Sequence, residues 1–250
     1  MKLEGKVCLI TGGSRGIGAA TALKLAAAGA NVSINARHDD AAARDVRCAV
    51  ERMGRLSHLV VADLADPHAA AIRCVEETRS ALGDPEILIH SAGGPAPGNI
   101  LDVTPAAWHG AFDVHLHAAF HLCRAVLPAM REKNDGAIIL ISSVAGLRGC
   151  SNSIAYSVVK SALPQFARSL ARDFADSNIR VNCVVPGIIR TRFHDSLSAS
   201  QVRNNIENRI PLRREGTPED VAEVILTLVQ NEFITGETVT VDGGMSMRMV

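Results

Sequence analysis

Short apolar runs alternate with longer segments of mixed polarity along the whole chain. Val, Ile and Leu dominate the runs, which predict buried strands at residues 6–11, 31–37, 56–61, 86–89, 137–142, 179–184 and 237–242. Apolar residues recur at helical spacing between them and predict helices at about residues 17–28, 41–53, 67–82, 105–130, 153–176 and 218–230. The predicted strands and helices therefore alternate along the chain, which is the pattern of an α/β protein.

This alternation indicates a Rossmann-type, doubly wound parallel sheet of about seven strands with helices on both faces. A chain of 250 residues is near the upper size for one hydrophobic core, and it contains no internal repeat. We therefore expect one domain over residues 1–250. The polar segment 190–216 interrupts the pattern, and its length and arginine content predict a lid over a polar or anionic substrate.

The composition of the chain argues against several classes of function. The chain has 26 basic and 26 acidic residues, so net charge gives no drive toward nucleic acid or an anionic membrane. No apolar run approaches the roughly 20 residues that span a bilayer. Six cysteines are scattered without a C-x-x-C motif, which predicts reduced thiols in a cytoplasmic protein.

A glycine-rich turn follows the first predicted strand and opens the first helix. Strand, glycine turn and helix are the context in which backbone N–H groups and a helix dipole bind a pyrophosphate. The candidate residues of this turn are Gly12, Ser14, Arg15, Gly16, Ile17 and Gly18. Further candidates lie at the carboxyl ends of later strands, where such sheets bind ligands: Asp63, Leu64, Ala92, Gly93, Pro186, Gly187, Ile188 and Thr191.

Arginines near the second strand favour NADP(H) over NAD(H). Arg37 ends that strand, where NAD-binding sites often hold the ribose with an acidic residue, and a guanidinium there suits a 2′-phosphate. Arg15 could add a second positive charge. Asp39 and Asp40 follow closely and leave NAD(H) open.

The candidate catalytic group is centred on Tyr156, the only tyrosine of the chain. Lys160 lies four positions later, so both side chains leave the same face of a helix. An ammonium beside a phenol favours the phenolate, and we expect it to lower the pKa of Tyr156 toward working pH. Ser143 ends a strand and can hydrogen-bond the same substrate oxygen.

These motifs together resemble the short-chain dehydrogenase/reductase family over essentially the whole chain. They read T-G-G-S-R-G-I-G at 11–18, Ser143, Y-x-x-x-K at 156–160 and P-G-I-I-R-T at 186–191. The ending at 234–244 resembles the 3-oxoacyl-[acyl-carrier-protein] reductase branch and its sugar- and alcohol-dehydrogenase relatives.

The resemblance implies a role for each residue of these motifs. Tyr156 is then the acid/base, Ser143 orients the carbonyl, and Lys160 holds the nicotinamide ribose. The Ile188 backbone and Thr191 are then contacts of the carboxamide and pyrophosphate region. The family also implies a homotetramer packed through the helices at 105–130 and 153–176 and the last strand.

Two positions depart from the family pattern. His90-Ser91-Ala92-Gly93 stands where the family has N-N-A-G, and His115 stands where the family has an asparagine whose main chain holds a proton-relay water. If a main-chain carbonyl fills that role, His115 can serve, and its imidazole could relay protons. If the asparagine side chain is required, the relay is impaired. We expect activity to be retained, with His115 as a catalytic residue.

Two further sequence patterns lead to predictions about the structure. His115, His117, His121 and Cys123 suggest a metal site, but they do not share one helix face, so no metal is expected. Pro164 falls inside the predicted helix at 153–176 and cannot donate to the Lys160 carbonyl. We expect water or a neighbouring subunit to take that carbonyl.

The sequence thus predicts an NADP(H)-dependent oxidoreductase acting on a carbonyl or secondary alcohol. A 3-oxoacyl thioester is the leading substrate, and Arg131, Lys133, Arg168 and Arg172 could dock an acidic carrier protein. A sugar or polyol dehydrogenase of the same family is the alternative. A cofactor-binding regulator with little catalysis is the alternative of another class, favoured by the two departures.

Overall fold

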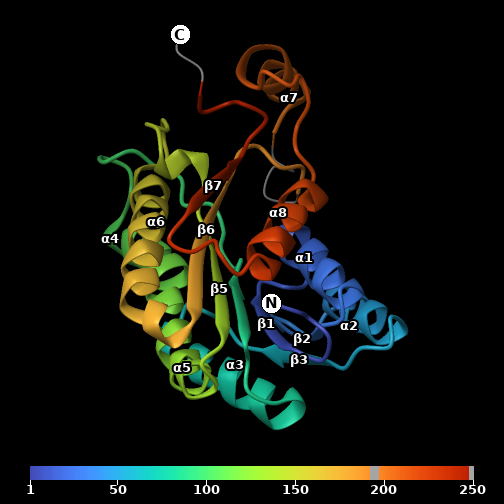
Figure 1. Cartoon of the computed structure of the whole chain (residues 1–250). Coiled ribbons are helices and arrows are strands. Elements are labelled where there is room, and N and C mark those ends of the chain that lie inside the picture. Colours follow the sequence, from blue (N-terminus) through green and yellow to red (C-terminus); the bar gives the residue numbers. More distant parts are fainter. Residues whose placement is uncertain (192–196, 248–250) are drawn as a thin grey trace.

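The computed structural model describes residues 1–191 and 197–247 as a three-layer α/β domain (Figure 1). The seven strands are β1 (Val7–Thr11), β2 (Asn31–Ala36), β3 (Ser57–Val61), β4 (Ile87–His90), β5 (Gly136–Ile141), β6 (Ile179–Pro186) and β7 (Thr238–Val241). They form one sheet in the order β3-β2-β1-β4-β5-β6-β7, and every pairing is parallel. The predicted doubly wound sheet is confirmed.

Helices cover both faces of the sheet. One face carries α1 (Gly16–Ala27), α2 (Ala41–Arg52) and α8 (Pro218–Gln230), and the other carries α3 (Pro67–Leu82), α5 (Ala118–Lys133) and α6 (Ile154–Phe174). Successive strand residues alternate between the two cores: Leu88 packs with α3, α5 and α6, whereas Ile87 and Ile89 pack with α1 and α8. Both faces are buried, which explains the continuous apolar runs.

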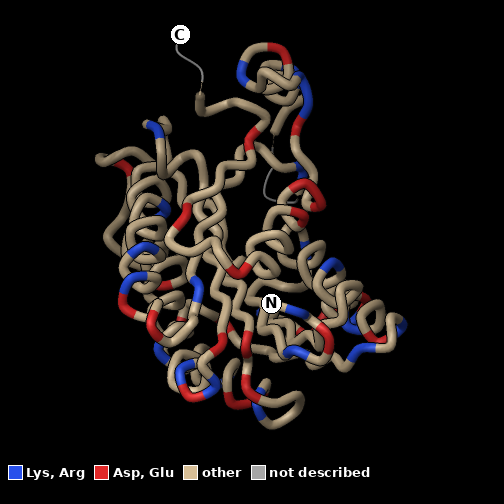
Figure 2. Tube along the Cα trace, in the orientation of Figure 1, with Lys and Arg blue, Asp and Glu red and all other residues tan. Residues whose placement is uncertain are grey.

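Polar side chains fix where several helices begin. Asp40, Asp66 and Thr104 each accept a hydrogen bond from a main-chain N–H of the helix that follows them. Thr217 and Asp220 form a reciprocal capping box at the start of α8. Figure 2 shows acidic and basic residues distributed over the outer helices.

The helix expected at 105–130 is interrupted by a wider turn. It divides into α4 (Pro105–Phe112), a π-helical turn η1 (Asp113–His117) and α5. A π turn inserts one residue into the helix, which the 3.6-residue pattern of apolar positions does not reveal. The π turn carries His115, which lines the cavity described below.

The prediction that water or a neighbouring subunit binds the Lys160 carbonyl was wrong. Helix α6 runs through Pro164 from Ile154 to Phe174, and the Ser142 hydroxyl donates to the Lys160 carbonyl at 2.7 Å. Neither water nor a second subunit is needed, because the end of β5 lies close enough to supply the donor.

No helix among residues 1–191 and 197–247 is both long and apolar enough to cross a membrane. All six cysteines are free thiols, and Cys8, Cys74, Cys123 and Cys183 are buried. Burial raises the pKa of the Cys74, Cys123 and Cys183 thiols to about 12, which keeps them protonated.

Candidate active site

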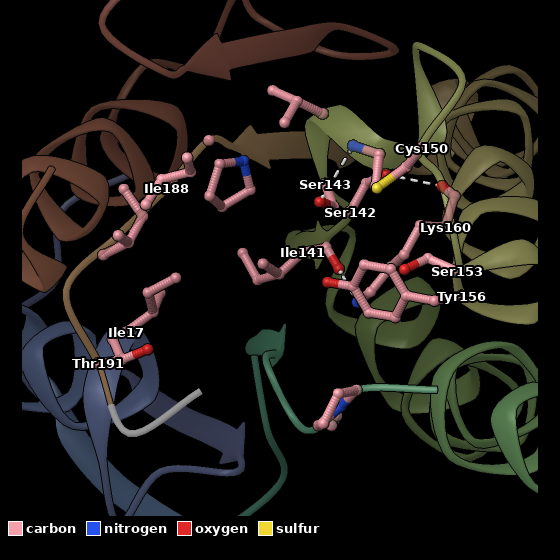
Figure 3. A pocket seen from close by; sticks show the side chains of 18 of the residues that line it. Ile17, Ile141, Ser142, Ser143, Cys150, Ser153, Tyr156, Lys160, Ile188 and Thr191 are labelled. Atoms are coloured by element: carbon pink, nitrogen blue, oxygen red, sulfur yellow. Dashed lines mark hydrogen bonds between the residues drawn. The ribbon is translucent and has the colours of Figure 1, made fainter. Parts of the chain in front are cut away.

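A cavity of about 690 Å³ opens at the carboxyl ends of the central strands. Strands β1, β4, β5 and β6 end around it, as expected for a parallel sheet with a switch of strand order beside β1. Most predicted site residues line it: Gly12, Arg15, Gly16, Ile17, Ala92, Gly93, His115, Ser143, Tyr156, Lys160, Pro186, Gly187, Ile188 and Thr191. In Figure 3, Ser143, Tyr156 and Lys160 lie on one side of the cavity, and Ile17, Ile188 and Thr191 face them.

Two elements bring the candidate catalytic side chains together. Ser143 follows β5 and caps the short turn η2 (Val144–Gly146), while Tyr156 and Lys160 project from the first turns of α6. Ser143 and Tyr156 are joined by a side-chain hydrogen bond. The Lys160 ammonium lies 5.7 Å from the centre of the Tyr156 ring and donates to the Ile141 carbonyl at 2.7 Å. A substrate oxygen can therefore meet two hydroxyls beside one buried amine.

Burial sets the protonation of this group. It raises the pKa of Tyr156 above its ordinary value, and the hydrogen bond with Ser143 opposes the rise. It also lowers the pKa of Lys160 to about 8. The expected lowering of the Tyr156 pKa is therefore not found. The physical reason is that desolvation of the phenol outweighs the hydrogen bond with Ser143, while the Lys160 ammonium is engaged with the Ile141 carbonyl.

The two histidines that depart from the family pattern contact each other. The His90 ring is hydrogen-bonded to the Thr11 hydroxyl at 2.9 Å through Nδ1 and to the His115 carbonyl at 3.1 Å through Nε2. A carbonyl only accepts, so Nε2 of His90 carries the proton and Thr11 donates to Nδ1. The main-chain carbonyl that the family resemblance assigns to the relay water thus already accepts one hydrogen bond.

The His115 side chain is buried beside Tyr156. Its ring lies edge-on to the Tyr156 ring at 5.5 Å between centres, and its Nε2 is 3.0 Å from the Gly94 carbonyl. Burial and the Lys160 charge lower the pKa of His115 to about 2. The imidazole is therefore neutral at any working pH, which argues against a relay through an imidazolium. Nδ1 has no hydrogen-bond partner among the described residues.

The glycine turn makes a close main-chain cradle. Gly12 has φ +64°, and a Cβ there would lie 2.8 Å from the Ala92 Cα atom. A Cβ on Gly18 would lie 2.2 Å from the Gly12 carbonyl oxygen. The first turn of α1 has no acidic residue and no side-chain cap. The free N–H groups and the cradle therefore fit the pyrophosphate of a dinucleotide.

Most of the residues predicted to bind the adenosine end of the cofactor do not line the cavity. Arg15 lies at the rim of the cavity and forms an ion pair with Asp40, the N-cap of α2. Arg37 is exposed at the end of β2, and Asp63 and Leu64 follow β3; none of the three lines the cavity. Ser14 and Gly18 also lie outside its lining.

The structure describes the predicted lid, residues 190–216, except for residues 192–196. Helix α7 (Ala199–Asn204) and the π turn η5 (Asn205–Arg209) lie above the cavity, and Gln201, Asn204 and Arg209 line it. Arg190 and Arg214 instead form ion pairs with Glu215 and Asp220. Arg192, Phe193 and His194, which belong to the predicted lid, lie outside the described residues. Among the described arginines of this segment, Arg209 is the one that lines the cavity.

Sequence reasoning missed part of the cavity wall. Pro95, Ala96 and Pro97 from the loop after β4, with Cys150, Ser153 and Met245, also line it. The Gly-Pro composition of residues 93–98 was a signal for a loop but not for its contacts. Ser142 was missed as well, although it directly precedes Ser143.

No group of three or more His, Cys, Asp or Glu side chains within 1–191 and 197–247 is arranged to hold a metal ion. His117 is hydrogen-bonded to Asp113 at 2.8 Å, and His121 packs against the His68 and Phe120 rings. The histidines of this helical segment thus point to different neighbours.

Comparison with known proteins places this geometry in a family. Residues 12–246 match the family model described as enoyl-(acyl carrier protein) reductase. The 3-oxoacyl-[acyl-carrier-protein] reductase FabG of Escherichia coli is 35% identical, and the match covers 99% of this chain and 100% of that protein. An uncharacterised oxidoreductase of Mycobacterium tuberculosis is 36% identical, with 98% of this chain and 94% of that protein covered.

A solved structure agrees closely in fold. L-sorbose reductase from Gluconobacter frateurii, complexed with NADPH and L-sorbose, matches with a TM-score of 0.92 and 30% identity, over 100% of this chain and 99% of that chain. The chain therefore belongs to the short-chain dehydrogenase/reductase family, and it is an oxidoreductase.

Proposed function

We propose that the protein is an NADP(H)-dependent reductase of carbonyl compounds that also oxidises the corresponding secondary alcohols. The observation that carries this proposal is the hydrogen-bonded pair Ser143–Tyr156 beside buried Lys160, facing the glycine turn across one cavity. Tyr156 gives a proton to the substrate oxygen during reduction, and Ser143 donates a hydrogen bond that orients the carbonyl. The bound nicotinamide supplies the hydride.

NADP(H) is proposed over NAD(H) because of positive charge at the glycine turn and at the end of β2. Arg15 and Arg37 are the cations available to a 2′-phosphate, and Arg15 would exchange Asp40 for the phosphate. The NADPH in the related L-sorbose reductase structure supports this assignment. Ala92, Gly93, Asp63 and Leu64 are proposed contacts of the adenosine and its ribose.

A 3-oxoacyl thioester is the proposed substrate class. The FabG relatives at 35% identity support it, and the apolar loop Pro95 to Pro97 offers a wall for an acyl chain. A sugar or polyol remains the second candidate, because the L-sorbose reductase shares the fold and because Gln201, Asn204 and Arg209 give the cavity a polar side. Segment 190–216 is proposed as the lid that selects between them.

We propose a cytoplasmic homotetramer as the working form. The groove between α5 and α6 is apolar, with Phe120, Phe166 and Leu170 among the residues that line it, and such surfaces are commonly covered by a second subunit. Arg131, Lys133, Arg168 and Arg172 are exposed and are proposed as a docking site for an acidic carrier protein.

The variant Tyr156→Phe tests the proposed function. It removes the proton donor but leaves the cavity shape, so turnover of an acetoacetyl thioester with NADPH should fall by about 100-fold or more. NADPH affinity, measured by fluorescence titration, should be unchanged. The control is Ser161→Ala, an exposed serine of the same helix.

Three outcomes separate the alternatives. Turnover of L-sorbose or polyols without turnover of the thioester selects the second substrate class. Tight NADPH binding by the wild-type protein without turnover of either class supports the regulator and contradicts an enzyme. Full activity of Tyr156→Phe contradicts the assigned chemistry.

A further inference from the structure

Pro164 leaves one main-chain carbonyl of α6 without its helical donor. Proline has no N–H, so the carbonyl four residues earlier, that of Lys160, loses the bond that a helix normally provides. The Ser142 hydroxyl donates to this carbonyl at 2.7 Å. Ser142 and Lys160 are only 3% and 5% exposed, so water does not reach the carbonyl in place of the hydroxyl.

The donor is held by the sheet. The Ser142 N–H donates to the Val184 carbonyl of β6 at 2.8 Å, which fixes Ser142 relative to the central strands. The preceding residue, Ile141, accepts the Lys160 ammonium at 2.7 Å. Two consecutive residues at the end of β5 therefore hold Lys160 by its main chain and by its side chain.

The turn that carries Ser143 packs on the same carbonyl. A Cβ added to Gly146 would lie 2.7 Å from the Lys160 carbonyl carbon and 3.0 Å from its oxygen. Only a glycine lets the η2 turn approach so closely. The place where Ser142 meets Lys160 is thus where the element bearing Ser143 and the element bearing Tyr156 are joined.

We propose that Ser142 is a positioning residue paired with Pro164. Its hydroxyl supplies the hydrogen bond that Pro164 withholds, and the bond sets the position of Tyr156 and Lys160 relative to Ser143. Without it the carbonyl is buried and unpaired, and the first turns of α6 move to find another donor. The consequence for catalysis rests on the proposed function; the coupling between residues 142 and 164 does not.

The experiment compares the wild-type protein with Ser142→Ala, Pro164→Ala and the double variant. Tyr156 is the only tyrosine, so the ultraviolet absorbance of tyrosinate during a pH titration reports this residue alone. Ser142→Ala should raise the pKa of Tyr156 because the first turns of α6 move and weaken the hydrogen bond with Ser143, which lowers this pKa. Residue 164 of Pro164→Ala regains an N–H for the Lys160 carbonyl, so Ser142→Ala should then have little further effect.

The size of the coupling between residues 142 and 164 tests the proposal. The effect of Ser142→Ala on the Tyr156 dissociation constant should be at least about threefold larger in the wild-type background than in Pro164→Ala. Urea unfolding of the same four proteins at neutral pH should show the same non-additivity and needs no turnover. If turnover is found, kcat should fall in Ser142→Ala with an unchanged KM for NADPH.

Two controls sharpen the test. Ser142→Thr keeps a hydroxyl and should titrate like the wild-type protein. Ser161→Ala removes an exposed hydroxyl that donates to the nearby Val158 carbonyl, and it should change nothing. Equal effects of Ser142→Ala with and without Pro164, or a Tyr156 titration that Ser142→Ala leaves unchanged, overturn the proposal. A protein with no turnover on any carbonyl would defeat the proposed function and leave the coupling to be judged by titration and unfolding.

Discussion

Single residues in this pocket are governed by desolvation more than by their charged neighbours. Lys160 is buried and is paired with a main-chain carbonyl rather than with a carboxylate, so the loss of water around its charge is only partly offset. Its pKa falls to about 8 for that reason. The folded protein therefore carries an energetic cost at neutral pH that a neutral side chain would not.

The first prediction concerns Lys160→Met. Below pH 8 the lysine is charged in both the folded and the unfolded chain, so the full cost of burying it is present. Between about pH 8 and the ordinary value of 10.5 the folded chain has released a proton that the unfolded chain still binds, so stability rises with pH. The stability of Lys160→Met relative to wild type should therefore decrease by up to about 3 kcal/mol across this window.

Urea unfolding of both proteins at a series of pH values measures that difference. Comparing the two proteins cancels the effect of the buried thiols, which are common to both. Lys133→Met, at a lysine whose side chain is 41% exposed, is the control. A difference between Lys160→Met and wild type that does not depend on pH would contradict the assignment.

The sequence brought the candidate catalytic residues to one site but did not predict their environment. Ser143, Tyr156 and Lys160 were chosen from spacing and strand ends, and they line one cavity. Spacing places Lys160 beside Tyr156 but does not reveal that its ammonium turns to the Ile141 carbonyl. The expected direction of the Tyr156 pKa was wrong because burial of the phenol raises this pKa.

Elements are joined here by side chains that bond to main-chain carbonyls. His90 links β1 and β4 to the π turn through Thr11 and the His115 carbonyl, much as Ser142 links β5 to α6. Hydrophobic periodicity could not predict either link. A π turn shifts the apolar pattern by one residue, and a proline in a helix does not indicate which group will donate to the carbonyl that it leaves unpaired. Periodicity did predict all seven strands, since both faces of the sheet are apolar.

The second prediction is that His90→Leu destabilises the protein. The substitution keeps the volume roughly similar but removes both ring nitrogens, leaving the Thr11 hydroxyl and the His115 carbonyl buried without this partner. Leaving buried polar groups unpaired should cost about 2 kcal/mol or more. Chemical unfolding measures the cost, and His109→Leu, at an exposed histidine of α4, is the matched control. A loss no larger than that of the control would show that the link carries no stability.

At the scale of the whole molecule, the class of sheet follows from the sequence because right-handed parallel crossovers leave few alternatives. The alternation of strands and helices predicted one doubly wound sheet, and the structure confirms it. The surface is different: composition and periodicity say which helix faces are apolar, but not which of them stay uncovered in a monomer. The groove beside α5 and α6, about 570 Å³ in volume, became visible only in the structure.

The third prediction concerns this groove, on which the proposed tetramer depends. Phe120 lies in its wall and is 45% exposed, so Phe120→Glu places a charge on the surface without opening the core. A subunit seated there would have to desolvate the carboxylate, so the assembly should dissociate into smaller species, measured by sedimentation equilibrium. Leu56→Glu, at a 60% exposed leucine of the far sheet edge, should leave the mass unchanged.

Dissociation should also weaken catalysis, because one helix carries both surfaces. Phe166, Leu170 and Phe174 line the groove, while Tyr156 and Lys160 project from the first turns of the same α6. A partner covering the far half of α6 would restrain the whole helix, so loss of mass and loss of kcat should follow the same dependence on protein concentration. A wild-type chain that sediments as a monomer, or a Phe120→Glu variant that keeps the wild-type mass, would show that this groove is not the subunit interface.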